Sequence, residues 1–314
     1  MPNKSLWVLY KKELADHLWS KRFAIILVLV AVTGLSSIYA AAGGIRSAVA
    51  QDGNTFVFLR LFTTAGGSVP SFISFMSFLG PLIGLALGFD AINGEINRGS
   101  LSRLLAQPIP RDTVINGKFL AGVTIISLMV ITLGMAIGGL GIIMIGIPPT
   151  LEEILRISVF FLFTILYMSF WLALSQLSSL FFRQTATSAL ACIAVWLLLS
   201  VFVGLLAGIA ADALFPLNNS ATVDMALKNS EVKLMLNRIS PATLYDESTI
   251  TLLNPGVRTL GPITENQLIG AIPGILPFSQ SLLLIWPHLI SLLALNMICF
   301  AISYIFFMRQ EIRA

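Results

Sequence analysis

The stretch FLAGVTIISLMVITLGMAIGGLGIIMIGI, residues 119–147, decides the fold, because it runs for 29 residues without a charged side chain. The hydrocarbon core of a bilayer is about 30 Å thick, and about 20 apolar residues in a helix cross it. The stretch therefore predicts a transmembrane helix that tilts or extends beyond the hydrocarbon.

The chain as a whole is also strongly apolar: 56% of its 314 residues are hydrophobic and 11% are charged. Soluble domains carry roughly 25% charged residues, so a water-soluble core cannot absorb this much apolar surface. We expect one all-α domain over residues 1–314, a polytopic integral membrane protein with six transmembrane helices. The predicted spans cover residues 23–42, 69–89, 119–147, 152–182, 186–211 and 284–308.

A helix is predicted before the first span, over residues 1–22. Its apolar stripe consists of Trp7, Tyr10, Leu14 and Leu18. Such a stripe beside lysines is typical of an interfacial helix that lies on membrane lipids. The alternative is a soluble helix packed on a partner. We expect residues 23–42 to be a retained span, because they are longer than the apolar core of a typical signal peptide.

Small residues recur at four-residue spacing in three of the predicted spans. This spacing leaves one face of a helix without side chains, so that a neighbouring helix can approach closely. The predicted packing positions are Gly80, Gly84 and Gly88 in the second span, Gly134 and Gly138 in the third, and Gly204 and Gly208 in the fifth.

The distribution of Lys and Arg residues predicts the orientation of the chain in the membrane. Twelve Lys and Arg side chains fall on the side of the chain ends and seven on the other side, which favours cytoplasmic termini in the plasma membrane. Residues 212–280 then form an extracytoplasmic segment with helix-like stretches such as 222–238. Its Pro-rich end, residues 268–280, is interpreted as a re-entrant or interfacial piece, with a seventh crossing as the alternative.

Side chains suited to catalysis are scarce. The chain has no Gly-x-x-x-x-Gly-Lys-Ser/Thr motif, so we expect it not to hydrolyse ATP by that route. His17 and His288 have no neighbours in sequence suited to metal binding or acid–base work, and Cys192 and Cys299 lie in apolar runs. We therefore expect no catalytic site, no metal site and no nucleic-acid partner. The span centres lack ionisable residues, which argues against ion-coupled transport.

The informative polar segment is residues 90–118, which contains NGEINRGSLSRLLAQPIPR over residues 93–111. Residues 100–107 can form two helical turns that bring Leu101, Leu104 and Leu105 together, and Pro108 and Pro110 end them. This short amphipathic helix is either a membrane-surface elbow or a docking element for a soluble partner.

The segment resembles that of the type-2 permease subunits of ATP-binding cassette transporters, with Ser100 in place of the commoner Thr. The residues that carry the resemblance are Gly94, Glu95, Arg98, Gly99, Ser100, Leu101, Leu104, Leu105, Pro108, Arg111, Gly117 and Lys118. The Lys12-Glu13-Leu14 helix before the first span and the six-span layout also match.

The resemblance implies that the chain is one half of a transporter. Two permeases, identical or homologous, would pair, and each would receive a cytoplasmic ATPase subunit that carries the ATP and magnesium; this chain would bind no cofactor. Residues 90–118 would be the coupling loop, with Glu95 and Arg98 as polar contacts and Leu101, Leu104 and Leu105 as the apolar anchor. We expect an exporter; the alternative is a non-transporting membrane sensor or assembly scaffold whose outer segment binds a ligand.

Overall fold

A computed structural model describes residues 2–52, 56–65, 69–107, 109–217, 222–256, 260 and 275–310. Six helices in these residues are long and apolar enough to cross a membrane, which confirms the predicted all-α polytopic fold. These candidate spans are Lys21–Ala41, Phe72–Asn97, Arg111–Met144, Leu151–Phe181, Thr185–Leu214 and Phe278–Arg309.

The described helices follow one another along the chain. They are α1 (Pro2–Leu18), α2 (Lys21–Asp52), α3 (Val57–Thr63), α4 (Phe72–Gly88), α5 (Asn93–Asn97), α6 (Ser100–Leu105), α7 (Arg111–Ile145), α8 (Leu151–Phe181), α9 (Thr185–Leu197), the π-helical η1 (Leu198–Phe202), α10 (Val203–Leu214), α11 (Val223–Asn237), α12 (Pro241–Leu253) and α14 (Phe278–Arg309).

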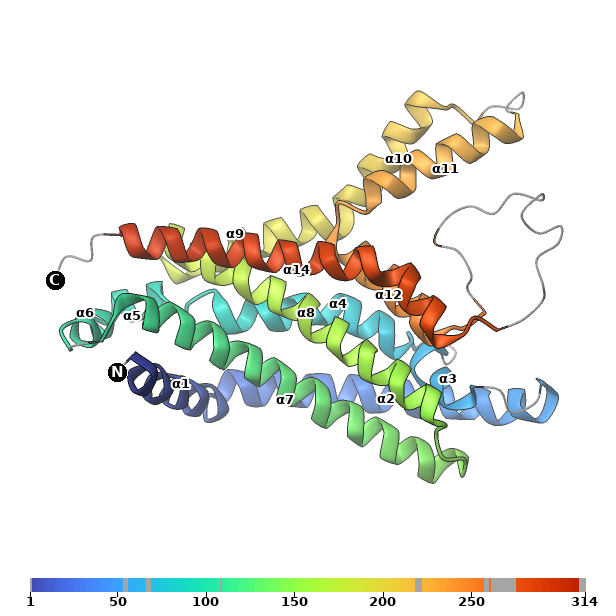
Figure 1. The fold of residues 1–314 in the computed structure, drawn as a ribbon, viewed down its shortest axis with the longest axis horizontal. Helices are drawn as coiled ribbons and strands as arrows, with labels where there is room; N and C mark the ends of the chain where they lie inside the picture. The colour runs from blue at the N-terminus through green and yellow to red at the C-terminus, as the bar shows by residue number, and fades with distance from the viewer. Residues whose placement is uncertain are drawn as a thin grey trace.

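The bundle has two distinct ends (Figure 1). The start of α1 and the end of α14 lie at the same end as α5 and α6, which we call the α6 end. Helix α3 lies at the opposite end, which we call the α3 end. Helix α8 runs through the middle of the bundle and packs against α4, α7, α12 and α14.

Two helix boundaries differ from the boundaries of the predicted spans. Helix α2 continues to Asp52, although glycines at positions 43 and 44 were expected to end the first span. Helix α14 begins at Phe278, after Pro277 as its N-cap, rather than near residue 284. Pro287 lies inside α14, which is tolerated because neighbouring helices can satisfy the freed carbonyl group.

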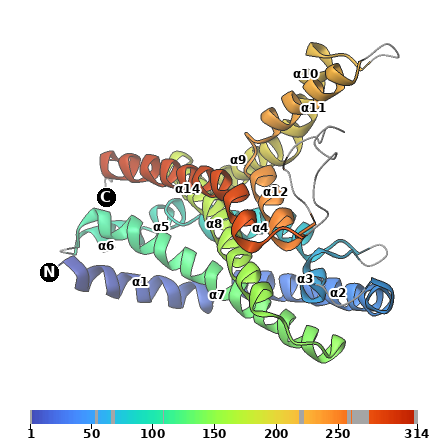
Figure 2. The ribbon, with the colours of Figure 1, turned by 45° about the vertical axis from the view of Figure 1, so that its right-hand side comes forward.

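The described part of residues 212–280, the segment predicted to be extracytoplasmic, is largely helical. Helices α10 and α11 form a hairpin that projects away from the bundle in both views (Figures 1 and 2), whereas α12 returns to pack on α8 and α14. The sequence predicted α11 but not α12. Residues 268–274 of the predicted re-entrant piece lie outside the described residues, and residues 278–280 form the first turn of α14.

Helices α4 and α8 cross at glycines. A Cβ atom added to Gly84 would lie 2.5 Å from the carbonyl oxygen of Met168, and one added to Gly88 would collide with the hydroxyl of Ser175. At Gly80 the nearest neighbour of an added Cβ is the side chain of Met168 at 3.3 Å. The small residues of α4 therefore let the two helix backbones approach closely.

The other predicted glycine faces have different surroundings. A Cβ atom on Gly134 would collide with the ring of Phe161 of α8, so this position of α7 is also a close approach. At the three remaining positions an added Cβ would have its nearest neighbour at ordinary contact distance, 3.7 Å for Gly138, 3.8 Å for Gly204 and 4.0 Å for Gly208.

A buried arginine holds three helices together at the α3 end. The guanidinium of Arg156 on α8 donates hydrogen bonds to the carbonyl oxygens of Leu252 at 2.8 Å and Leu276 at 2.7 Å, and to the hydroxyl of Ser281 at 3.1 Å. It also pairs with Glu152 at 2.8 Å. These contacts join α12, the chain before α14 and α14 itself to α8.

Candidate functional site

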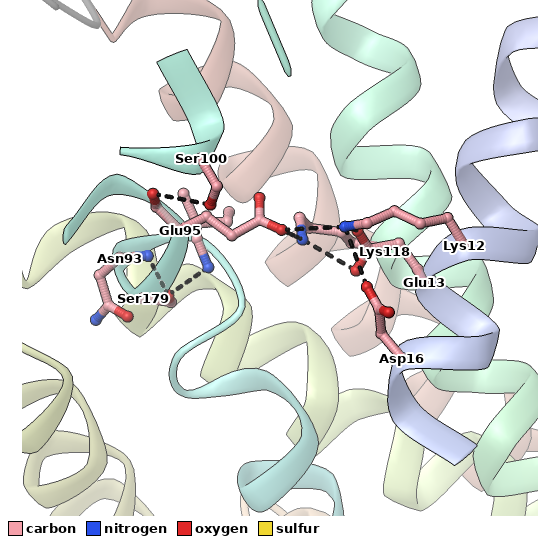
Figure 3. A network of polar contacts seen from close by, with 9 residues as sticks. Lys12, Glu13, Asp16, Asn93, Glu95, Ser100, Lys118 and Ser179 are labelled. Carbon is pink, nitrogen blue, oxygen red and sulfur yellow. Dashed lines mark hydrogen bonds and ion pairs between the residues drawn. The ribbon is translucent and has the colours of Figure 1, made fainter. Parts of the chain in front are cut away.

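An ion network joins α1, α5 and α7 at the α6 end (Figure 3). The ammonium group of Lys118 on α7 lies 2.8 Å from a carboxylate oxygen of Glu95 on α5 and 3.0 Å from one of Glu13 on α1. All three side chains are buried. One lysine therefore connects the predicted coupling loop to the N-terminal helix and to the third span.

Lys12 extends this network towards solvent. Its ammonium group lies 3.0 Å from Glu13, 3.1 Å from Asp16 and 3.7 Å from Glu95. Burial favours the protonated carboxyl of Glu13, but the ammonium groups of Lys118 and Lys12 outweigh it and lower the pKa of Glu13. Glu13 is therefore ionised at neutral pH, and the network shares two lysines among three carboxylates.

The loop is fixed to the end of α8 through its backbone. The hydroxyl of Ser179 accepts hydrogen bonds from the backbone N–H groups of Ile92 at 2.9 Å and Asn93 at 3.0 Å. The side-chain amide of Asn93 donates to the carbonyl of Phe182 at 3.0 Å. These bonds satisfy the polar groups at the start of α5, so α5 moves with α8 unless they break.

The apolar side of α6 is also occupied within the chain. Leu101 has an exposed fraction of 0% and belongs to a small buried cluster, and Leu104 packs against the same cluster. The other members of the cluster are Leu9, Ile92, Val114, Ile115 and Phe307. The predicted anchor therefore packs on α1, α7 and α14 in this chain. The side chain of Leu105 and all of Pro108 lie outside the described residues.

The loop presents a polar face between α5 and α6. Asn97, Arg98, Gly99, Ser100 and Arg103 are exposed there. Gly99 has a φ of 66°, a left-handed conformation that favours glycine and allows α6 to start directly after α5. Gly94, in contrast, is buried within α5.

Two further polar contacts secure the loop. The hydroxyl of Ser100 donates to the backbone carbonyl of Glu95 at 3.2 Å. At the start of α7, the guanidinium of Arg111 donates to the carbonyl of Gln310 at 3.1 Å, just after α14. Ser100 thus fixes the start of α6 to α5, and Arg111 connects the start of α7 to the end of α14.

A polar cavity of about 560 Å³ lies beside the ion network. Its lining includes Lys12, Glu13 and His17 of α1, Arg22 at the start of α2, and Gln176 of α8. Burial lowers the pKa of His17, which favours its neutral form. No group of three or more metal-ligating side chains is found in the part of the chain that the structure describes.

The sequence did not reveal the pairing of Lys118 with Glu13, because 105 positions separate these residues. The contact of His288 with Glu247 was not predicted from sequence either. The Nε2 atom of His288 lies 2.7 Å from a carboxylate oxygen of Glu247, and Arg238 contacts the same oxygen at 2.9 Å. Glu247 lies 41 positions before His288, so this contact could not be assigned without the fold.

The arrangement defines a multi-pass α-helical membrane protein with a short helical loop at one end, fixed to several spans. The chain belongs to the ABC-2 family of transporter proteins: the sequence model described as "ABC-2 family transporter protein" matches residues 7–312. This membership confirms the resemblance seen in the loop sequence.

Two curated relatives match part of the chain. A "Probable ABC transporter permease protein NosY" from Pseudomonas aeruginosa (strain PAO1) is 32% identical over 158 residues, which are 49% of this chain and 51% of that protein. A protein with the same name from Stutzerimonas stutzeri is 35% identical over 128 residues, which are 40% and 41% of the two chains. The chain thus matches about half the length of these relatives, or less.

Proposed function

We propose that this chain is the permease subunit of an ATP-binding cassette transporter, an exporter whose energy comes from a separate ATPase subunit docked at the α6 end. Family membership and the permease names of the two relatives support this assignment. The observation that carries the mechanism is the buried contact of Lys118 with Glu95 and Glu13. ATP and magnesium belong to the ATPase in this proposal, and the α6 end is cytoplasmic.

The docking surface is the exposed polar face of the loop, centred on Arg98. Arg98, Ser100 and Arg103 are accessible there, whereas Glu95 and Leu101 are buried in the chain. Two of the residues expected from the resemblance to contact the ATPase therefore take a supporting role. Glu95 connects the loop to the ion network, and Leu101 anchors α6 on the apolar cluster.

Force from the ATPase reaches the spans through these buried contacts. A displacement of α5 moves Glu95 and with it Lys118, because separating a buried ion pair leaves uncompensated charges and costs about 3–5 kcal/mol. Helices α7 and α1 therefore follow the loop. Ser179 transmits the same displacement to the end of α8.

The apolar exterior fits a membrane and a second permease, either a copy or a homologue. Leu190 and Leu197 of α9 and Leu205 and Ile209 of α10 are exposed in the single chain. Only 11% of the most apolar 18-residue stretch of this span, Thr185–Leu214, is buried within the chain. Lipids and the paired permease would cover this surface.

The proposal is tested by co-purification. The tagged full chain is extracted in mild detergent, and the bound protein is identified by mass spectrometry as an ATP-binding cassette ATPase and quantified against the permease. Arg98→Glu should reduce the bound ATPase at least tenfold, because the charge reversal lies on the docking face. Lys233→Glu is the matched control, an exposed charge reversal on α11.

The control should retain the ATPase at the wild-type ratio. Equal amounts of ATPase on wild type and Arg98→Glu would contradict docking on the loop. Loss of the ATPase from both variants would show an effect of charge reversal in general and would also contradict the proposal. The absence of any such ATPase from the wild-type chain would favour a membrane sensor or scaffold.

A further inference from the structure

A second cavity lies at the α3 end, far from the loop. Its volume is about 410 Å³, within the range of small-molecule sites. The side chains around it come from α3, from the start of α4 and from α12 with the residue that follows it. They are Thr63, Ser71, Ile73, Ser74, Ser77, Asp246, Ile250 and Asn254.

The lining has a definite chemistry. Four hydroxyl groups and the side-chain amide of Asn254 surround one carboxylate, that of Asp246, and none of these lining residues is basic. Hydroxyl and carboxylate oxygens accept hydrogen bonds, and the carboxylate adds a negative charge. This combination attracts a cation with N–H donors and disfavours an anion.

Among the residues that the structure describes, no Lys, Arg or His side chain forms an ion pair with the carboxylate of Asp246. Burial raises its pKa to about 6, although the hydroxyl of Ser77 hydrogen-bonds to it and opposes the rise. The adjacent carboxylate of Glu247 raises the pKa further. The side chains of Arg238 and His288 both contact the neighbouring Glu247. An incoming positive charge would stabilise a partly buried carboxylate in this state.

Two tyrosines lie beside Asp246. Tyr245 precedes it on α12, and Tyr167 of α8 stacks on Tyr245 with ring centroids 4.5 Å apart. The hydroxyl of Tyr167 donates to the carbonyl of Ser77, and that of Tyr245 pairs with Thr164. Both phenols are neutral at physiological pH, so they leave the charge of Asp246 uncompensated.

We propose that this cavity binds a small organic cation, with Asp246 pairing to the protonated amine and the hydroxyls of Ser74 and Ser77 accepting its remaining N–H groups. The size of the cavity favours an organic amine over a bare metal ion, which requires several ligands at short distance. Ile73 and Ile250 supply apolar contacts for its carbon skeleton. The proposal is independent of ATPase docking, because these residues lie at the opposite end of the bundle.

The test measures binding of phenethylamine to the full chain in lipid nanodiscs by ligand-observed NMR, with empty nanodiscs as background. The neutral analogue 2-phenylethanol has a similar size and shape, and 3-phenylpropionate carries the opposite charge. Phenethylamine should bind, and both analogues should bind at least tenfold more weakly. Equal binding of 2-phenylethanol would overturn the proposal, because the carboxylate would then contribute nothing.

Variants locate the site. Asp246→Asn should weaken phenethylamine binding at least tenfold, and Asp224→Asn, which removes an exposed carboxylate on α11, should leave it unchanged. If Asp246→Asn does not fold, Ser74→Ala combined with Ser77→Ala should weaken binding severalfold in its place. Wild-type affinity in the folded cavity variants would overturn the assignment.

The proton competes with the amine for Asp246, which gives a second readout. With a pKa of about 6 in the empty cavity, roughly one molecule in eleven carries the ionised carboxylate at pH 5. Lowering the pH from 7.5 to 5 should therefore weaken binding by about tenfold in the wild type. The residual binding of Asp246→Asn should not change with pH. A wild-type affinity that is the same at both pH values would contradict a direct ion pair.

Discussion

Lys118 and Glu95 form a buried ion pair at 2.8 Å that connects the third span to the short loop helix α5. Lys118 also contacts Glu13 of α1 at 3.0 Å, so a single ammonium group is shared by two carboxylates from different helices. Such a shared partner makes the three helices interdependent, because removal of the lysine leaves the two buried carboxylates with only the half-exposed Lys12 as a cationic partner among the described residues.

Lys118→Met should therefore loosen α1 and the loop while leaving the bundle assembled. We expect a loss of about 3–5 kcal/mol in local stability, the usual cost of removing one partner from a buried ion pair. Hydrogen–deuterium exchange should show faster exchange in α1 and α5 and unchanged exchange in α12. Unchanged protection of α1 would contradict the importance of this pair.

A triple variant separates charge from packing. Combining Lys118→Met with Glu13→Gln and Glu95→Gln removes the unpaired charges and should recover much of the lost protection. If the triple variant exchanged faster than Lys118→Met alone, the loss would come from side-chain packing rather than from uncompensated charge.

Gly84→Ala should destabilise the crossing of α4 and α8. The added Cβ would lie 2.5 Å from the carbonyl oxygen of Met168, a backbone atom that cannot move aside without shifting α8. Overpacking of this kind costs about 1–3 kcal/mol and should lower the thermal unfolding temperature in detergent. Gly139→Ala is the matched control, because an added Cβ on this α7 glycine meets no atom within 4 Å among the described residues. Equal effects of the two substitutions would contradict close packing at Gly84.

Arg156→Lys should loosen the start of α14. The guanidinium of Arg156 donates to two carbonyl groups and the hydroxyl of Ser281, whereas a lysine ammonium cannot reproduce this planar fork. We expect lower thermal stability and faster exchange in α12 and the first turns of α14. Exchange in α1 should not change, and an equal increase there would point to general unfolding instead.

Asp246→Asn should stabilise the ligand-free protein at neutral pH. The pKa of Asp246 is raised to about 6 in the fold, above the value of about 3.9 for an unfolded chain, so ionisation opposes folding. The loss of folding free energy caused by this ionisation is absent below pH 4, grows between pH 4 and 6, and reaches up to about 3 kcal/mol above that range. The unfolding temperature of the variant should exceed that of the wild type at pH 7.5, and the difference should fade towards pH 4.

A destabilising residue retained in a cavity is what a binding role requires, since function often conflicts with stability. The comparison of thermal stability across pH therefore complements the binding experiment. A variant that is less stable than the wild type at pH 7.5 would contradict the assigned burial of an uncompensated charge at Asp246.

The membrane spans could be predicted because each one is a continuous run of mostly apolar residues. The 29 uncharged residues from position 119 predict a helix without reference to any other part of the chain. Helix α12 was missed for the opposite reason. Its apolar face is short and interrupted by Asp246 and Glu247, so its place against α8 and α14 depends on the surrounding fold.

The loop was located from sequence, but the roles of its residues were not. Glu95 has the appearance of an exposed charge in the sequence and is buried against Lys118 in the structure. Leu101 was interpreted as an outward anchor and packs on Leu9 and Phe307 from the two ends of the chain. Contacts between residues this distant in sequence carry no local signal.

The most direct test of coupling is a distance measurement at the α3 end of the complex with its ATPase. Spin labels at Ile143→Cys on α7 and Leu283→Cys on α14, both exposed positions, are placed in a chain with Cys192 and Cys299 replaced by alanine. The ATPase is loaded with a non-hydrolysable ATP analogue, and double electron–electron resonance reports the distance between the labels. We predict that the analogue shifts the distance distribution in the chain with Lys118 and leaves it unshifted in Lys118→Met, although the ATPase remains bound. The same shift in both chains would contradict transmission through Lys118.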